Sequence, residues 1–386
     1  MKFSRKLLTI GHSYIVPLNR RLANEMSRIS QWEITVVSPS ALKGDLRPLK
    51  LEINAHDRAT VEGVPVRFDR VPQLMIYGDR LREILRQNWD LVHCWEEPYV
   101  LSGGQVAWYT PKHVPLVYFT AQNNSKDYPL PFNWIETQTM QRSSGWIAAG
   151  QLVANALKHR KGYDRPMRMI PHGVDVDCFC PNSKARQAIH QQLEWDQMNV
   201  PVIGFLGRFV PEKGLSLLMQ VLDRINQPWR ALFVGTGAME ADLRSWSKQY
   251  GDQVRICTTV THDQVPDYLN AMDLLCAPSQ TTRGWREQFG RMLIEAFACG
   301  VPVIGSDSGE IPYVIADAGI VVSEQDEQAW IQAISLLLED SEQRHELAQR
   351  GLDRAHSVYQ WSAIAKQHLE FFDAILAQHS QRLEVV

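Results

Sequence analysis

Two cations five residues apart, Arg208 and Lys213, form the first candidate for chemistry in this sequence. They follow an apolar run, residues 201–206, which is typical of a β-strand and leads into Gly207. A helix is predicted to begin at Gly214. Backbone N–H groups at a helix start attract anions, Arg grips phosphate through two donors, and Lys acts as a point charge. The spacing predicts a phosphate site, although a solvated loop with two surface cations has the same pattern.

Two carboxylates eight residues apart, Glu287 and Glu295, form the second candidate. Glu295 falls inside a helix predicted over residues 290–299, whereas Glu287 precedes that helix in a loop. At about 100° per residue, Glu295 lies next to the apolar face of the helix. A buried carboxylate needs hydrogen-bond donors, and the hydroxyls of a ribose would supply two. A plain ion pair with a nearby Lys or Arg explains the position equally well.

A third element is the glycine turn Val234-Gly235-Thr236-Gly237, between a predicted strand and a predicted helix. Glycines at such a turn let a ligand approach the backbone closely. A tight strand-to-helix turn without a ligand would require the same residues.

The elements that must position these residues alternate between short apolar runs and amphipathic stretches, which predicts βα units and parallel sheets. Strands are expected at residues 6–10, 34–38, 90–95, 114–120, 146–149, 201–206, 230–234, 254–257, 274–278, 301–305 and 319–322, with a β-rich stretch at 51–68. Helices are expected at residues 17–27, 80–87, 135–142, 187–195, 214–225, 238–250, 264–270, 290–299, 327–338, 341–357 and 361–378. The interdomain linker is placed near residues 175–200. Two doubly wound α/β domains are the simplest architecture, with ligands at the carboxyl ends of the strands.

Length and composition agree with two globular domains. The chain has 386 residues, and roughly 150 residues per domain favours two. The apolar fraction of 45% and charged fraction of 22% exclude a disordered, collagen-like or coiled-coil protein. The net charge of −3 argues against a nucleic-acid binder driven by bulk charge. Six cysteines, none in a CxxC pair, predict reduced thiols rather than a zinc site or a disulfide framework.

No run of 18 apolar residues and no signal peptide is recognised, so a cytoplasmic protein is expected. Residues 17–30 carry Arg20, Arg21 and Arg28 beside Leu18, Leu22 and Met26. This basic amphipathic pattern is compatible with weak peripheral attachment to the inner face of a membrane. An ordinary helix with a solvated basic face is the competing interpretation.

The order and spacing of the motifs in the second half resemble the retaining glycosyltransferases of family 4, which have the GT-B fold. The matching segments are Gly-Arg-x4-Lys-Gly at residues 207–214, Val-Gly-x-Gly at 234–237, Ala-Pro-Ser at 277–279, Glu-x7-Glu at 287–295, Gly-x-Pro-Val-Ile-Gly-x3-Gly-Glu at 300–310, and Ile-Pro-His-Gly-Val-Asp at 170–175. The resemblance implies two Rossmann-like doubly wound domains facing across a cleft. Residues 1–180 would bind the acceptor, residues 181–360 the nucleotide sugar, and a C-terminal helix over about 361–386 would pack back on the first domain.

The resemblance also implies roles for individual residues. Arg208 and Lys213 would hold the donor diphosphate and Glu287 the hydroxyls of the transferred sugar, so these three form the catalytic set. Phe289 and Gly290 would offer backbone amides, Glu295 would bind the ribose, and Gly11 would let the first domain approach the phosphates. The full donor-binding set comprises Gly11, Gly207, Gly235, Gly237, Thr258, Phe289, Gly290, Arg291 and Glu295. Thr258 stands where the family often has a glycine near the nucleobase.

The acceptor is expected at the strand ends of the first domain. The predicted acceptor-binding residues are His12, Tyr14, Trp95, Glu96, Gln122 and Asn123. Trp95 has a ring that could stack on a sugar or pack in the core, and Glu96 either binds an acceptor hydroxyl or is solvated. Many family members carry a histidine after the strand at 114–120, where this chain has Gln122 and Asn123; hydrogen bonds from these amides are the expected substitute.

The mechanism that the resemblance implies is front-face displacement with retention, in which the departing phosphate oxygen accepts the acceptor's proton. The chain has no Asp-x-Asp motif, so Arg208 and Lys213 would replace a metal, and no cofactor is expected. Preorganised cations and amides that stabilise the leaving diphosphate are usually the largest catalytic contribution. UDP-hexose is the default donor and GDP-mannose the next, with a glycan, a lipid-linked sugar or a small molecule as acceptor. Polysaccharide biosynthesis is a plausible setting.

Three other functions use the same residues. A sugar-nucleotide epimerase or a phosphorylase would share the fold, and an epimerase would turn over a UDP-sugar without any acceptor. A non-catalytic subunit would bind a nucleotide sugar or glycan, although Arg208, Lys213, Glu287 and Glu295 are all intact. A Rossmann oxidoreductase is disfavoured because the first strand is not followed by GxGxxG.

Overall fold

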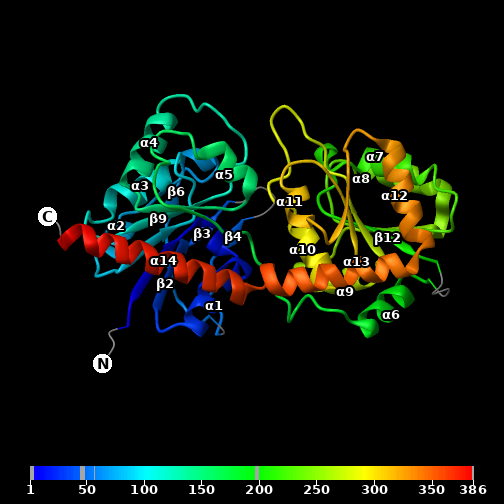
Figure 1. The fold of residues 1–386 in the computed structure, drawn as a ribbon, viewed down its shortest axis with the longest axis horizontal. Coiled ribbons are helices and arrows are strands. Elements are labelled where there is room, and N and C mark those ends of the chain that lie inside the picture. The colour runs from blue at the N-terminus through cyan, green and yellow to red at the C-terminus, as the bar shows by residue number, and fades with distance from the viewer. Residues whose placement is uncertain (1–3, 44–47, 56, 196–199, 385–386) are drawn as a thin grey trace. The chain divides into compact units, whose positions relative to one another are not determined.

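The computed structural model describes residues 4–43, 48–55, 57–195 and 200–384 (Figure 1). It divides into two compact units: unit 1 comprises Met1–Pro171 and Trp361–Val386, and unit 2 comprises His172–Gln360. The chain enters unit 2 at His172, inside the Ile170–Asp175 motif segment and before the linker expected near 175–200. Residues 196–199 of that linker, and residues 385 and 386 of the predicted C-terminal helix, lie outside the described residues.

Unit 1 is built on a seven-stranded parallel sheet with the order β11-β10-β9-β8-β1-β2-β5. Its strands are β1 (Lys6–Ile10), β2 (Glu33–Pro39), β5 (Thr60–Val64), β8 (Leu91–Cys94), β9 (Leu116–Thr120), β10 (Gly145–Ala148) and β11 (Met167–Met169). Two small antiparallel pairs join β3 (Ala41–Leu42) to β4 (Leu49–Lys50) and β6 (Val66–Arg67) to β7 (Ile76–Tyr77). The chain builds the sheet outward from β1 in both directions, so the topological switch point lies between β1 and β8. Ligands of open α/β sheets bind at such a point.

The helices of unit 1 are α1 (Arg21–Ile29), α2 (Arg80–Leu85), α3 (Leu101–Tyr109), α4 (Phe132–Arg142), α5 (Gln151–Leu157) and α14 (Trp361–Glu384). Helix α3 was not predicted, because residues 102–107 are all buried and leave no apolar stripe of helical period. The last helix, α14, runs beside α1 (Figure 1) and places Ile364 and Phe372 in the core of unit 1.

Helix α1 does not have the free amphipathic face that the basic sequence suggested. Leu22 and Met26 lie in the core of unit 1, and the Arg20 side chain, just before α1, is fully buried and paired with Asp57. Arg28 pairs with Glu25 of the same helix. The apolar side predicted to touch lipid is therefore used inside the fold. Among the described residues, no helix combines the length and the apolar character needed to span a bilayer.

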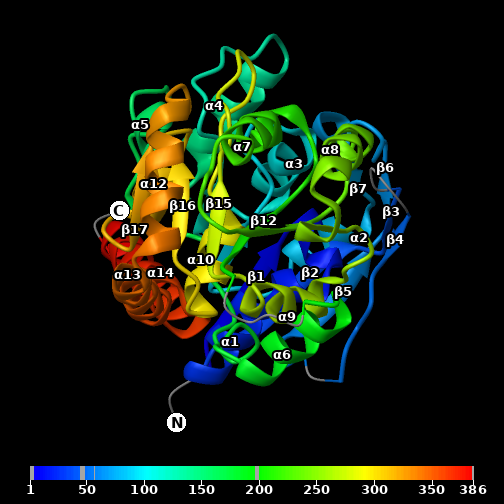
Figure 2. The ribbon, with the colours of Figure 1, turned by 90° about the vertical axis from the view of Figure 1, so that its right-hand side faces the viewer.

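Unit 2 is built on a six-stranded parallel sheet with the order β14-β13-β12-β15-β16-β17. Its strands are β12 (Val202–Leu206), β13 (Arg230–Val234), β14 (Val254–Cys257), β15 (Leu274–Ala277), β16 (Val303–Ser306) and β17 (Gly319–Val322). Its helices are α6 (Ser183–Gln192), α7 (Leu215–Leu222), α8 (Glu240–Ser247), α9 (Val265–Asn270), α10 (Arg291–Ala298), α11 (Ile311–Ile315), α12 (Glu327–Glu339) and α13 (Ser341–Arg354). Helices α12 and α13 lie beside β17 (Figure 2). The switch point of this sheet lies between β12 and β15.

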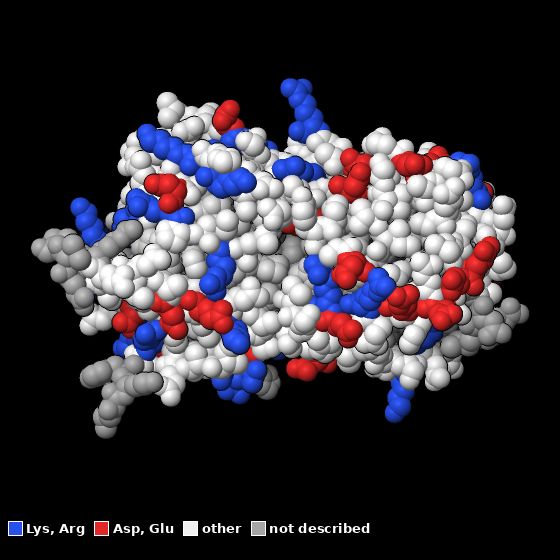
Figure 3. All heavy atoms as spheres, viewed as in Figure 1, with Lys and Arg blue, Asp and Glu red and all other residues white. Residues whose placement is uncertain are grey.

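Most differences from the predicted elements have local causes. Helix α6 begins at Ser183, before the expected residue 187, because the Asn182 side chain accepts from the N–H groups of Lys184 and Ala185 at 3.1 Å. Helix α11 has five residues and Pro312 in its first turn, too short a segment to show a period. On the face visible in Figure 3, Lys and Arg are interspersed with Asp and Glu over unit 2, as the near-balanced composition requires.

Two buried histidines, His93 of β8 and His368 of α14, lie with ring centroids 5.6 Å apart in the core of unit 1. The indole N–H of Trp95 donates to Nδ1 of His93 at 3.2 Å, so the proton of His93 is on Nε2. Nδ1 of His368 faces the carbonyl of Ile364 at 2.9 Å, so its Nε2 is bare. Burial lowers the pKa of both rings, that of His368 to about 4. Both rings are therefore neutral, and the buried Nε2 of each lacks a hydrogen-bond partner among the described residues.

Unfolding of unit 1 should therefore depend on pH through His368. In the unfolded chain His368 binds a proton below its ordinary pKa of about 6.5, whereas in the native state it does so only below about pH 4. The free energy of unfolding therefore falls as the pH falls from 6.5 toward 4. We expect the wild type to lose about 2 kcal/mol more than His368→Phe between pH 7 and pH 5. Urea unfolding followed by tryptophan fluorescence measures this difference. Parallel losses in the two proteins would contradict it.

Candidate active site

At the carboxyl end of the unit 2 sheet, the loops after β12 and β13 are packed backbone against backbone. Gly207 N–H donates to Val234 O at 3.0 Å, and Phe209 N–H donates to Thr236 O at 2.9 Å. A Cβ on Gly235 would lie 1.8 Å from Gly207 O, and Gly237 is similarly close to Phe209 O. The predicted glycine turn thus has an internal reason for its glycines, since they let the two loops meet.

The central feature of the site is a buried ion pair between Lys213 and Glu287. The Lys213 side chain is 14% exposed and that of Glu287 is 8% exposed. Ser279, just after β15, donates its hydroxyl to Oε2 of Glu287 at 3.0 Å, the same oxygen that Lys213 contacts. In the sequence these two residues belong to separate motifs, and their spacing predicts no contact between them. The fold brings them together across the switch point between β12 and β15.

Two glycines hold the ion pair in place by close backbone approach. Gly214 has a φ of +74°, and a Cβ there would lie 1.8 Å from Pro278 O. Gly309 has a φ of +59°, and a Cβ there would lie 2.0 Å from Glu287 O, which also accepts from Glu310 N–H at 3.0 Å. Both positions require a left-handed backbone and leave no room for a side chain. The backbones of Lys213 and Glu287 are therefore fixed along with their side chains.

Trp285 is part of the site, although the sequence interpretation missed it. The ammonium group of Lys213 lies 5.2 Å from the centroid of the indole ring, within cation–π range. The signal available in the sequence was a tryptophan two residues before Glu287 in a polar loop. Ser279 belongs to the Ala-Pro-Ser motif, but the sequence did not predict its hydrogen bond to Glu287. Lys213 is thus positioned by a carboxylate and an aromatic face.

The remaining donor candidates divide into buried and exposed groups. Glu295 is buried in α10; burial raises the pKa of its carboxyl, and the charge of nearby Arg291 only partly opposes this. Phe289 is buried, with its ring 5.1 Å from that of His172, and Gly290 is the left-handed residue before α10. Arg208 is 65% exposed at its side chain and only loosely paired with Glu212, at 3.8 Å.

Thr258 follows β14 at the same end of the sheet and is half-buried. The five strand ends β12 to β16 thus carry Arg208, Gly235, Thr258, Ser279 and Gly309. The hydrogen bonds and ion pairs of the described residues join Lys213, Ser279 and Glu287. Glu295 lies near Arg291, and Arg208 pairs loosely with Glu212.

The carboxyl end of the unit 1 sheet holds a second buried carboxylate, that of Glu96, which is 1% exposed. Its Oε1 accepts from the backbone N–H of His12 at 2.6 Å and from the Tyr77 hydroxyl at 2.7 Å. Its Oε2 contacts Nδ1 of His12 at 2.8 Å and accepts from the Ser102 hydroxyl at 3.2 Å. Burial alone would raise the pKa of Glu96, but these partners, led by His12, outweigh it and hold the pKa below its ordinary value. Glu96 is therefore a charged positioning group.

Trp95, Tyr14 and Gly11 form the packed floor beneath His12. A Cβ on Gly11 would lie 2.8 Å from Cβ of Trp95, so this glycine is required by packing. Trp95 stacks on Phe119 with centroids 3.9 Å apart. The Tyr14 ring is buried and its hydroxyl shares a 2.7 Å hydrogen bond with Thr9, so Tyr14 supports the loop and offers no group to a ligand.

Gln122 and Asn123 follow β9 at the same edge of the sheet. The Gln122 side chain donates to the hydroxyl of Tyr128, whose ring stacks on Tyr99 at 4.0 Å between centroids. Asn123 is 1% exposed. Of the predicted acceptor residues, His12 is the one whose side chain is both polar and half exposed.

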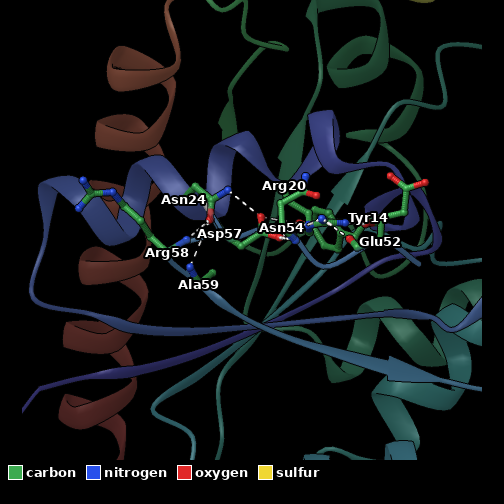
Figure 4. A network of polar contacts seen from close by, with 8 residues as sticks. All are labelled: Tyr14, Arg20, Asn24, Glu52, Asn54, Asp57, Arg58 and Ala59. Atoms are coloured by element: carbon green, nitrogen blue, oxygen red, sulfur yellow. Dashed lines mark hydrogen bonds and ion pairs between the residues drawn. The ribbon is translucent and has the colours of Figure 1, made fainter. Parts of the chain in front are cut away.

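A buried arginine anchors the loop that carries His12 (Figure 4). Arg20 donates to Tyr14 O at 2.8 Å and to Glu52 O at 2.6 Å, and pairs with the carboxylate of Asp57 at 2.9 Å. Asn24 donates to the same carboxylate at 3.1 Å. Burial opposes ionisation of Asp57, but the bonds from Arg20 and Asn24 keep its pKa below the ordinary value. This network ties residues 14–20 to residues 52–59.

Comparison with known proteins identifies the family. The model described as "Glycosyl transferases group 1" matches residues 185–354, and the model "Glycosyltransferase Family 4" matches residues 18–178. A D-inositol 3-phosphate glycosyltransferase of Salinispora tropica is 30% identical over 330 residues, covering 77% of this chain and 66% of that enzyme. The chain belongs to glycosyltransferase family 4. The match thus spans about two thirds of that relative's length.

Other proteins similar to this family 4 glycosyltransferase include a mannosyltransferase and two proteins of known structure. A GDP-mannose-dependent monoacylated alpha-(1-6)-phosphatidylinositol monomannoside mannosyltransferase of Corynebacterium glutamicum is 30% identical over 55% of this chain and 57% of that enzyme. Among solved structures, sucrose-phosphate synthase of Thermosynechococcus elongatus has a TM-score of 0.73 at 19% identity, covering 97% and 100% of the two chains. Anabaena HepE in complex with UDP has a TM-score of 0.73 at 17% identity, covering 96% and 100%. These likenesses confirm the predicted GT-B fold, and the family assignment argues against the oxidoreductase alternative.

The buried pair of the glycosyltransferase should be strongly coupled in stability. Lys213→Met leaves a buried carboxylate without its cation and should destabilise unit 2 by about 3–5 kcal/mol. Lys213→Met combined with Glu287→Gln should recover most of that loss, because no unpaired charge remains. Urea unfolding of the two single variants and the double variant gives the coupling free energy.

Arg208→Ala is the matched control, since this exposed cation should change stability by less than about 0.5 kcal/mol. If the double variant loses the sum of the single losses, the two side chains are not energetically coupled.

Proposed function

We propose that this protein is a retaining, metal-independent glycosyltransferase that moves a hexose from a nucleoside diphosphate sugar, UDP-hexose first, to a hydroxyl of its acceptor. The observation that carries the proposal is the Lys213–Glu287 pair at the switch point of the unit 2 sheet. Lys213 supplies a fixed cation for the leaving diphosphate, and Glu287 supplies a fixed acceptor for sugar hydroxyls. Both groups are largely desolvated, so each interaction with substrate is stronger than it would be in water.

The charge of the leaving diphosphate is the main quantity that the site must stabilise. Lys213 meets it as a preorganised point charge, and Arg208, which is exposed and loosely paired, can rotate toward a bound phosphate and grip it through two donors. The N–H groups at the start of α10 add further donors near Gly290. In this mechanism the leaving phosphate oxygen takes the acceptor's proton, so no separate base is required from the protein.

The relatives favour particular substrates. The inositol phosphate enzymes suggest a polyol acceptor that carries a phosphate, and the mannosyltransferase keeps GDP-mannose as the second donor. Polysaccharide or glycolipid assembly in the cytoplasm remains part of the proposal. An epimerase would instead consume the donor without acceptor, and a binding subunit would hold the nucleotide without turnover.

Lys213→Ala should lower turnover by about 10²-fold or more, since removing one preorganised donor costs roughly 3–4 kcal/mol of transition-state stabilisation. Initial rates with saturating donor and acceptor measure this effect, and EDTA should leave the wild-type rate unchanged. Lys213→Arg serves as the charge-conserving comparison and should retain part of the activity. Unchanged turnover in Lys213→Ala would remove this residue from the mechanism.

The donor base can be identified by thermal shift with UDP, GDP, ADP and CMP. A ligand at 100 times its dissociation constant stabilises the native state by about 2.7 kcal/mol. We expect UDP to raise the melting temperature of the wild type and Glu295→Ala to lose that rise, because the buried carboxylate would no longer accept from the ribose. A larger shift with GDP would identify guanine as the base of the donor. A rise in melting temperature that persists in Glu295→Ala would show that Glu295 does not bind the ribose.

A further inference from the structure

The side chain of His12 is held in one orientation by the buried carboxylate of Glu96. Nδ1 donates to Oε2 at 2.8 Å, while Oε1 already holds the backbone N–H of the same residue at 2.6 Å. Tyr77 and Ser102 fill the remaining acceptor directions of that carboxylate. Glu96 therefore has no hydrogen-bonding capacity left for a ligand, and it acts through His12.

The imidazole is a cation at neutral pH. The charge of Glu96 raises the pKa of His12 to about 9, against the opposing effect of burial and with a smaller contribution from Glu97. The other titratable groups at this point are the phenols of Tyr77 and Tyr14 and the thiol of Cys94, and burial raises the pKa of each, so they stay neutral. With Nδ1 donating to Glu96, the second N–H of the ring is on Nε2.

Contacts that do not involve the imidazole also hold the loop of His12. Arg20 donates to Tyr14 O at 2.8 Å, Asn19 donates to Ser13 O at 2.7 Å, and Gly11 N–H donates to Val37 O at 3.1 Å. The backbone N–H of His12 is itself tethered by Glu96. Half of the imidazole surface, 51% of the side chain, remains exposed to solvent. The exposed half of the ring is therefore accessible to a ligand while the other half contacts Glu96.

The position of His12 is where a ligand of unit 1 is expected. His12 comes two residues after the end of β1, and Glu96 comes two residues after the end of β8. The pair therefore lies at the carboxyl ends of the two strands that flank the switch point. A fixed N–H donor that carries charge recognises an oxyanion better than it recognises a neutral hydroxyl. We propose that His12 is a phosphate-binding residue of unit 1, which donates from Nε2 to a phosphate oxygen of a substrate. The proposal rests on the proposed function, since a phosphorylated acceptor and a nucleoside diphosphate are the two sources of such an oxygen.

The direct test is the ¹⁵N NMR spectrum of the histidine side chains, titrated with inorganic phosphate at pH 7.5. One imidazolium resonance, absent from His12→Gln, should shift with phosphate and remain unmoved by chloride at equal ionic strength. His113→Gln, a variant of an exposed histidine of unit 1, should leave that response intact. No phosphate-dependent shift of the His12 resonance, with phosphate, UDP or an inositol phosphate, would overturn the proposal.

The pH dependence separates ligand binding from a structural role. In the wild type the phosphate response should persist to pH 8.5 and disappear above about pH 9. Glu96→Gln should bring the pKa of His12 back toward about 6.5. It should therefore lose the response at pH 8 and keep it at pH 6. If Glu96→Gln does not fold, His12→Lys gives the same information, because a lysine should restore phosphate binding at pH 8 without restoring the hydrogen bonds of the imidazole. Failure of His12→Lys to bind phosphate, together with a wild-type response independent of pH, would contradict the proposal.

Kinetics distinguish the source of the phosphate. If the acceptor carries it, His12→Gln should raise the KM of a phosphorylated acceptor by at least about tenfold and leave the KM of its neutral analogue unchanged. If the donor diphosphate is the ligand, His12→Gln should raise the KM of the donor instead. The proposed function is refuted by a different result, namely no thermal shift with any nucleotide and no turnover in the wild type. In that case the NMR titration with inorganic phosphate would still test phosphate binding by His12.

Discussion

A buried carboxylate at the switch point of each sheet is the constraint on which both halves of the structure depend. In unit 2 Glu287 holds Lys213, and in unit 1 Glu96 holds His12. A charged carboxylate with so little exposure needs a cationic partner and hydrogen-bond donors, so each one constrains the side chains that surround it. The hydroxyls of Ser279, Ser102 and Tyr77 fill this need. The result in each unit is one cation whose position is set before any ligand arrives.

Close backbone packing is what permits these pairs to be buried. Gly214 and Gly309 let the loops of Lys213 and Glu287 approach within distances that exclude any Cβ, and Gly11 does the same beneath His12 by making room for Trp95. In unit 1 the buried Arg20–Asp57 pair adds a second fixed point on the other side of the His12 loop. Rigidity of the site therefore comes from backbone contacts and satisfied charges, together with short 3-10 helices at His12–Ile15 and Pro211–Lys213.

The sequence was sufficient where the pattern is local. Strands β1, β13, β14 and β17 begin and end where they were predicted, because short apolar runs between turns mark them clearly. Lys213 and Glu287, predicted from separate motifs, form an ion pair, whereas the ribose role of Glu295 stays a prediction. The sequence did not predict partners that depend on the tertiary fold. Trp285, which contacts Lys213, and Tyr77 and Ser102, which donate to Glu96, come from segments without any motif. The same limit explains the interpretation of α1, where Arg20 seemed a surface cation because Asp57, its partner, is far away in sequence.

Under the proposed function, the two cations that would contact the donor have different surroundings. Lys213 is already neutralised by Glu287, so an incoming diphosphate has to compete with that carboxylate for the ammonium group. The ion pair with Glu287 stabilises Lys213 when no ligand is bound. The binding energy that Lys213 contributes then depends on how much negative charge the ligand carries. A leaving diphosphate, whose charge grows as the sugar bond breaks, competes better than an intact nucleotide sugar, so the contact favours the transition state over the ground state. Arg208 is exposed and has only a loose partner, so it can engage the intact donor first. The proposed function thus assigns donor binding mainly to Arg208 and transition-state stabilisation mainly to Lys213, two cations of one loop.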